Sequence, residues 1–188
     1  NGVHVDFNSG APVVSCGLPI NASEGCASYS DPATGQFIAY TDGQTVWNAQ
    51  TNATLANGTA LIGSSTSIET AMILPKPGGT VDQFYIVHNN INSCYWSEVD
   101  MSVGVNGTVV SSNNLMTNTS TERSGTVPHG ADCEKYWIVI SNNQNAELAS
   151  YEVTPAGINM TPIISPTGII GGQSRGVIDF SSDYTRLG

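Results

Sequence analysis

The sequence predicts an all-β protein made of β-propeller-type blades, each blade a sheet of four antiparallel strands. Short runs rich in β-branched and aromatic residues alternate with clusters of Gly, Pro, Asn and Asp, and helical periodicity is almost absent. One pattern also recurs along the chain: a polar residue, an aromatic residue, an aliphatic run and a turn rich in Asn or Asp. The repeat spacing of about 45–55 residues is typical of four-stranded propeller blades.

The recurring pattern predicts the second strand of each blade. Its copies are GQFIAYTDG at 35–43, DQFYIVHNN at 82–90 and KYWIVISNN at 135–143. Each copy has a strand candidate before it, a third strand candidate after it and a looser fourth one beyond. We therefore expect one propeller-like segment over 1–188 with three complete blades, at about 24–66, 69–117 and 122–171.

Two segments resemble single strands of incomplete blades. Residues 3–14 resemble a last strand without its predecessors, and RGVIDFSSDYTRLG at 175–188 resembles a first strand without its successors. Known propellers contain about four to eight blades, so this arrangement leaves open sheet edges, which readily pair with other strands. We expect these edges to bind either more of the parent chain or neighbouring copies, joined head to tail into a filament.

Composition excludes several classes of partner. The chain carries 15 Asp and Glu against 5 Lys and Arg, a net charge of −10, and so few cations argue against nucleic-acid binding. No apolar run approaches the roughly 18 residues that a membrane span requires. The chain starts at Asn1 without a signal-peptide pattern, which favours a mature or excised segment of a secreted or cell-surface protein.

Asparagine and cysteine residues suggest modification outside the cell. Asn-x-Ser/Thr sequons make glycosylation possible at Asn21, Asn52, Asn57, Asn106, Asn118 and Asn159. Asn57 and Asn106 are the best candidates, because each precedes Gly-Thr in a predicted turn between strands. The even number of cysteines favours two disulfides, for which three connectivities exist. The short intervening loop favours Cys16–Cys26, which leaves Cys94–Cys133; the alternative is four buried free thiols.

No sequence motif indicates catalysis or a cofactor. His4, His88 and His129 lie in different predicted strands, and a structural role is favoured for each. Asp42-Gly43 partly resembles a sialidase Asp-box, but the two residues are adjacent and are better explained as a hairpin turn. We therefore expect a non-enzymatic protein without catalytic residues or cofactors.

Three carboxylates fall at equivalent positions of the repeats. Glu24, Glu69 and Glu122 each begin the first strand of a predicted blade, the strand that lines the channel of a propeller. They could form a ring that binds a cation through oxygen ligands. The alternative, which we favour, is that each carboxylate accepts hydrogen bonds from backbone amides at a strand start.

Several segments carry a family resemblance. VDFNSGAPV, NASEGCASYSDPATGQFIAYTDGQTVWN, NGTALIGSSTSIETAMILPKPG and CYWSEVDM occur in an order that resembles the N-terminal propeller region of large secreted bacterial surface proteins, associated with gliding motility and carrying a C-terminal sorting domain. HGADCEKYWIVI at 129–140 is similar to a strand pair of that family, with an insertion-like difference in spacing, and the resemblance covers nearly the whole chain. It implies a propeller fold, secretion and a surface role.

The function expected from the sequence is structural or adhesive. We expect an extracellular or cell-surface module, with a filament-forming subunit as one form of it. The alternative is a propeller that binds or hydrolyses glycans, which requires acidic and aromatic side chains gathered in one cleft.

Overall fold

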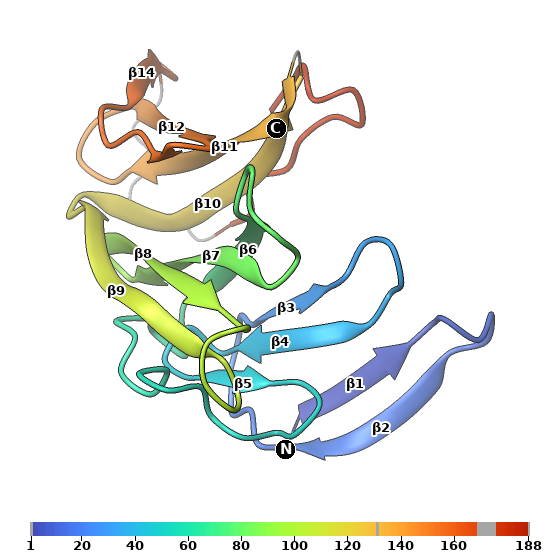
Figure 1. Cartoon of the computed structure of the whole chain (residues 1–188). Helices are drawn as coiled ribbons and strands as arrows, with labels where there is room; N and C mark the ends of the chain where they lie inside the picture. Colours follow the sequence, from blue (N-terminus) through green and yellow to red (C-terminus); the bar gives the residue numbers. More distant parts are fainter. Residues whose placement is uncertain (1, 131, 169–175, 188) are drawn as a thin grey trace.

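The computed structural model describes residues 2–130, 132–168 and 176–187. Across these residues the chain is all-β, with fourteen strands in four antiparallel sheets and no helix. Figure 1 shows the four sheets stacked side by side in chain order. The stack is open, because the first and last sheets lie at its opposite ends in that view.

The first sheet is a hairpin, whereas the sequence predicted one strand over residues 3–14. Its strands are β1 (Gly2–Asp6) and β2 (Val13–Leu18). Between them the amide of Gly10 donates to the carbonyl of Phe7 (3.1 Å), and Gly10 has a φ of +84°. The Asn-Ser-Gly segment is therefore a turn that ends one strand before the next apolar run begins another.

The second sheet has three strands. They are β3 (Ala27–Ser30), β4 (Phe37–Thr41) and β5 (Val46–Asn48). The predicted turn at Asp42-Gly43 is confirmed: Asp42 Oδ1 accepts the amide hydrogens of Gln44 (3.0 Å) and Thr45 (2.8 Å), and Gly43 has a φ of +79°. This turn joins β4 to its antiparallel partner β5.

The fourth strand expected near the end of 24–66 is absent. Residues after β5 form only isolated bridges, from Thr54 to Trp47 and from Ala56 to Thr108. Asn52 and Asn57 both have left-handed backbone conformations, with φ of 57° and 58°. Such residues interrupt an extended strand, so this segment folds as turns that connect the second and third sheets.

The third sheet has all four strands that the repeat predicts. They are β6 (Ala71–Pro75), β7 (Gln83–Asn90), β8 (Ser93–Asp100) and β9 (Thr108–Thr117). Because successive side chains point to opposite faces, the FYIV run of β7 buries Phe84 and Ile86 on one face and Tyr85 and Val87 on the other. A continuous apolar run fits this strand because the sheet lies between two others.

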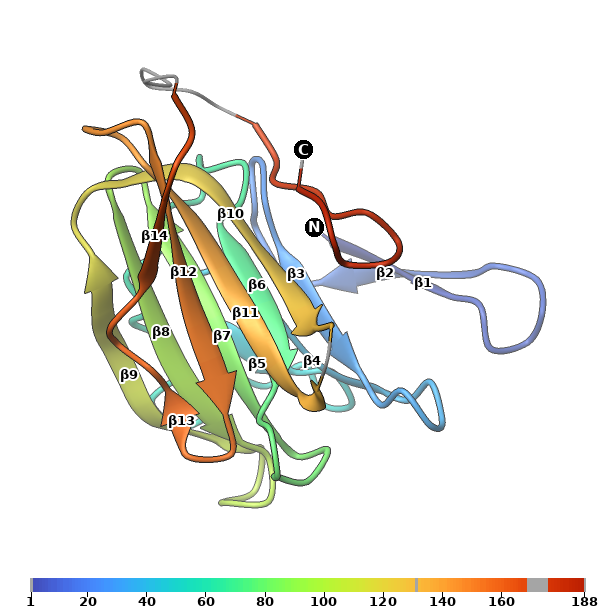
Figure 2. The same cartoon turned by 90° about the horizontal axis from the view of Figure 1, so that it is seen from above.

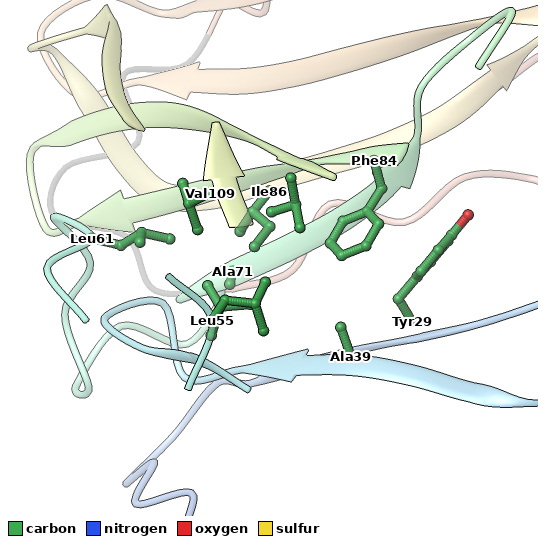
Figure 3. Close-up of a cluster of buried hydrophobic side chains, with 10 residues drawn as sticks. Tyr29, Ala39, Leu55, Leu61, Ala71, Phe84, Ile86 and Val109 are labelled. Carbon is green, nitrogen blue, oxygen red and sulfur yellow. The ribbon is translucent and has the colours of Figure 1, made fainter. Parts of the chain in front are cut away.

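The core is divided between the two interfaces of the third sheet. Figure 3 shows the cluster against the second sheet, in which Tyr29 and Ala39 face Phe84 and Ile86. The other cluster joins the third sheet to the fourth through Leu74, Tyr85, Val87, Cys94, Met116, Ile138, Ile140, Tyr151 and Val153. Each interface buries mainly aliphatic and aromatic side chains.

The fourth sheet completes the stack. Its strands are β10 (Ser120–His129), β11 (Asp132–Asn142), β12 (Glu147–Thr154), β13 (Gly157–Ile158) and β14 (Ile163–Pro166), and both β13 and β14 pair with β12. Figure 2 shows that the strand axes of β10–β12 and β6–β8 are roughly aligned, while the β1–β2 hairpin extends away from them. The last residues of the predicted blade, 169–171, lie outside the described residues.

The segment 176–187 packs against the outer face of the fourth sheet. Ile178 is only 8% exposed, and Ile178 and Phe180 lie directly over Gly125 of β10. The predicted first strand at 175–188 is not formed in the described part of this segment, which makes only one bridge, between Phe180 and Leu187. Its two end residues lie outside the described residues.

Candidate functional site

A cavity of about 380 Å³ lies between the β1–β2 hairpin and the second sheet. Four consecutive residues of β1, Gly2 to Val5, form one wall. The segment that leads into β3 and the side chains of Phe37 and Tyr40 contribute to the rest of the lining. The cavity therefore has walls from both the hairpin and the second sheet.

Ring stacking holds the hairpin over the second sheet. His4 of β1 stacks on Phe37 of β4, with ring centroids 4.3 Å apart and ring planes 13° apart. The row continues through Tyr40 to Trp47, with centroid distances of 5.5 Å and 5.3 Å. Asn8 Nδ2 adds a hydrogen bond to the carbonyl of Gly35 (3.1 Å).

The cavity follows the open edge of β1. Neighbouring side chains of a strand point to opposite faces, so a cavity that touches four residues in succession runs beside the backbone. Within the described part of the chain, β1 pairs with β2 alone. The backbone groups on its other edge are therefore available for a further strand.

Both ends of the stack carry exposed apolar side chains. On the hairpin, Val3, Val5, Val14 and Cys16 share one face, because Val3 pairs with Cys16 and Val5 with Val14. His4 lies on the opposite face, so this apolar face points away from the second sheet. Val3 and Val14 are 56% and 60% exposed.

At the other end, the outer face of the fourth sheet is only partly covered. A second cavity of about 290 Å³ lies between this face and residues 180–187. Val127, Trp137, Val139 and Ile163 line it from the sheet, and Ile163 is 59% exposed. The outer face is therefore apolar like the faces inside the stack.

The three glutamates considered as a possible cation ring are not gathered into one. In the described parts of the chain, no group of three or more His, Cys, Asp or Glu side chains could hold a metal ion. Glu122 instead accepts a hydrogen bond from the amide of Ile68 (3.1 Å), the alternative that the sequence favoured. Glu69 is half-buried, which raises the pKa of its carboxyl group, whereas exposed Glu24 lines the 380 Å³ cavity.

The histidines have structural surroundings. His88 is fully buried, with Nδ1 3.1 Å from the carbonyl of Ile62 and Nε2 2.9 Å from Ser97 Oγ. A carbonyl can only accept, so Nδ1 carries the proton and Ser97 donates to Nε2. The serine hydroxyl also accepts the amide hydrogen of Asn113 (3.1 Å). Burial lowers the pKa of His88 from 6.5 to about 4, which keeps the ring neutral. Ser97 is fully buried as well.

The expected Cys16–Cys26 disulfide is absent from the structure. Both thiols are free and exposed, Cys16 on β2 and Cys26 just before β3. Cys16 belongs to the hairpin face that points away from the second sheet, whereas Cys26 lines the cavity beneath the hairpin. Cys94 is free and buried, and burial raises the pKa of its thiol. The side chain of its expected partner, Cys133, lies outside the described residues.

Most predicted glycosylation sites are accessible. Asn21, Asn52, Asn57, Asn118 and Asn159 are exposed. Asn106 is half-buried, its carbonyl accepts a hydrogen bond from Asn48, and its side chain accepts one from Thr51, which makes it a poorer candidate than the sequence suggested. Glycosylation of the others stays a prediction.

The chain matches no protein-family model, no curated protein and no solved structure. Among the described residues, none forms a helix long and apolar enough to cross a membrane. An open edge near the start of the chain was expected from the sequence, but the β1–β2 hairpin that carries it was missed, because 3–14 was taken as one strand. The turn residues Asn-Ser-Gly at 8–10, followed by Val13 and Val14, are the signal that could have shown a hairpin.

Proposed function

We propose that this chain is a non-enzymatic structural module of propeller-type blades that acts outside the cell and assembles with further copies of itself. The observation that carries the proposal is the apolar surface at both ends of an open stack of sheets. Val3, Val5 and Val14 lie exposed at one end, and Ile163 lies exposed at the other.

The interior of the stack supports this reading. Both internal interfaces are made of side chains of the same kind as those at the ends, and there they are buried. Burial of apolar surface stabilises by about 25 cal/mol per Å², so contact between two such ends is favourable. A further sheet placed on either end would continue the packing already present inside the chain.

Exposed sequons support a location outside the cell. They lie at five surface asparagines spread from the first sheet to the fourth.

The alternative of a glycan-binding or glycan-hydrolysing propeller has less support. Phe37 and Tyr40, the two central rings of the aromatic row, each stack on two other rings, so these rings serve to pack the hairpin on the second sheet.

Sedimentation velocity tests the proposed self-association. We expect the average mass of the wild-type chain to rise with concentration, and Val14→Glu to weaken this rise because it puts a charge on the apolar hairpin face. Val105→Glu is the matched control, because Val105 is 98% exposed and lies outside both end faces. A wild-type chain that keeps the monomer mass from low-micromolar to near-millimolar concentration contradicts the proposal.

A further inference from the structure

We propose that the cavity beside β1 is a slot for one added β-strand, and that its occupant is the segment GVIDF (176–180) of a second copy of this chain. The inference rests on the proposed self-association and names the two segments that meet. The added strand would pair with the open edge of β1 and place side chains alternately toward the second sheet and away from it.

The proposed occupant matches the slot's β1 wall in length. It runs along four consecutive residues of β1, a strand of five residues. Five extended residues span about 16 Å at 3.3 Å per residue, so the segment and the edge match in length. The facing wall is mixed, with Phe37 for apolar side chains and Ser28 and Asn21 for polar ones.

The order of strands in the other sheets indicates on which edge of the first sheet an added strand would fit. In the third and fourth sheets the earliest strand in sequence, β6 or β10, forms one edge of the sheet. The third sheet ends at its other edge with β9, from which the chain continues to the next sheet. Since β2 likewise leads on to β3, the open edge of β1 lies on the side where an earlier strand belongs.

The segment 176–180 has the apolar residues expected of a strand, but it is paired with no strand of the four sheets. Its Val177 is 60% exposed, and Ile178 is its one buried residue. In the described residues it pairs with no strand of the sheet beneath it, and its one bridge joins Phe180 to Leu187 of the same C-terminal segment. Its backbone can therefore pair with another edge if Ile178 and Phe180 move away from the outer face of the fourth sheet.

The contact must join two copies, and it must join unlike ends. Figure 1 places 176–187 and β1 at opposite ends of the stack, so the segment of one chain lies far from its own slot. Pairing of two β1 edges is disfavoured by charge, because the first 75 residues contain no Lys or Arg, and Asp6 and Glu24 lie near the slot. Repeated head-to-tail contact builds an open chain of copies.

A labelled peptide with the sequence of 176–187 tests the slot on the full-length chain. We expect saturable binding to the wild type and none by a scrambled peptide. Ser28→Trp fills the cavity and should weaken binding at least tenfold. Ser30→Trp is the matched control: it is an exposed serine two residues further along the same strand and outside the cavity lining, and it should bind like the wild type.

A thiol-reactive group on the peptide gives a second readout without any substitution. It should modify Cys26, which lines the slot, faster than Cys16, which lies on the opposite face of the hairpin. Equal modification of the two exposed thiols, or unchanged binding by Ser28→Trp, overturns the slot.

The two proposals fail in different ways. If the chains associate in sedimentation but the peptide does not bind, the strand slot is wrong and the proposed function stands. If the peptide binds while the chains remain monomeric at every concentration, β1 accepts an added strand, but the proposed self-association and the second copy as occupant are both wrong.

Discussion

Burial of His88 makes the stability of this fold depend on pH. The ring is enclosed between Ile62 and Ser97 and its pKa falls from 6.5 to about 4. Above pH 6.5 the ring is neutral in both folded and unfolded chains. Between pH 6.5 and pH 4 the unfolded chain binds a proton that the folded chain does not, so stability falls as the pH falls through this window. At 1.36 kcal/mol for each pKa unit, the loss amounts to about 3 kcal/mol.

Substitution His88→Gln isolates this contribution. The glutamine amide can donate to the carbonyl of Ile62 and accept from Ser97 but does not titrate. We expect the variant to be less stable than the wild type at pH 7 and the difference to shrink by about 3 kcal/mol at pH 4. Urea unfolding followed by tryptophan fluorescence between pH 4 and pH 7.5 measures both proteins.

Titration of carboxyl groups does not obscure the comparison between the wild type and His88→Gln. The pKa of Glu69 is raised by burial, so its effect on stability has the opposite sign: it destabilises as the pH rises through the raised value. That contribution is present in both proteins and cancels in their difference. Parallel pH profiles for the wild type and His88→Gln would refute the account of a buried neutral ring.

Three further predictions follow from the packing. Phe84→Ala should destabilise by about 3–5 kcal/mol because the ring is fully buried between two sheets, whereas Val105→Ala should change stability by less than about 0.5 kcal/mol in the same urea experiment. Gly25→Ala should lower the thermal midpoint, since a Cβ there would collide with the backbone of residues 67–70, while Gly130→Ala, with open space around it, should not. The Cys94 thiol should resist alkylation in the native chain, whereas the exposed thiols of Cys16 and Cys26 should react. Mass spectrometry of the labelled peptides measures this, and rapid labelling of Cys94 in the native chain would refute its burial.

The all-β class could be predicted because its signals are local. The repeated aromatic and aliphatic run marks β4, β7 and β11, the strands that carry much of the core. The turn at Asp42-Gly43 was also predictable, because its conformation depends on the two residues themselves. These features need no knowledge of which sheets meet.

Two of the features that failed depend on contacts between distant segments. The residues after β5 were expected to form a fourth strand, but Asn57 adopts a left-handed backbone and its side chain donates to the carbonyl of Val109 in the next sheet. The three glutamates occupy equivalent repeat positions. Glu122 accepts a hydrogen bond from the amide of Ile68, whereas Glu24 lies exposed at the hairpin cavity. Position in a repeat does not determine the partners of a side chain.

Hydrogen exchange of the β1 amides at two protein concentrations tests the central claim most directly. The stack is open, and we propose that the free edge of β1 binds a strand of another copy. We therefore expect amide hydrogen exchange in β1 to slow as the protein is concentrated. Exchange in β7, which is buried within the stack at any concentration, should not change. Exchange in β1 that is equally fast in dilute and concentrated samples, at concentrations where sedimentation shows association, would contradict pairing at this edge.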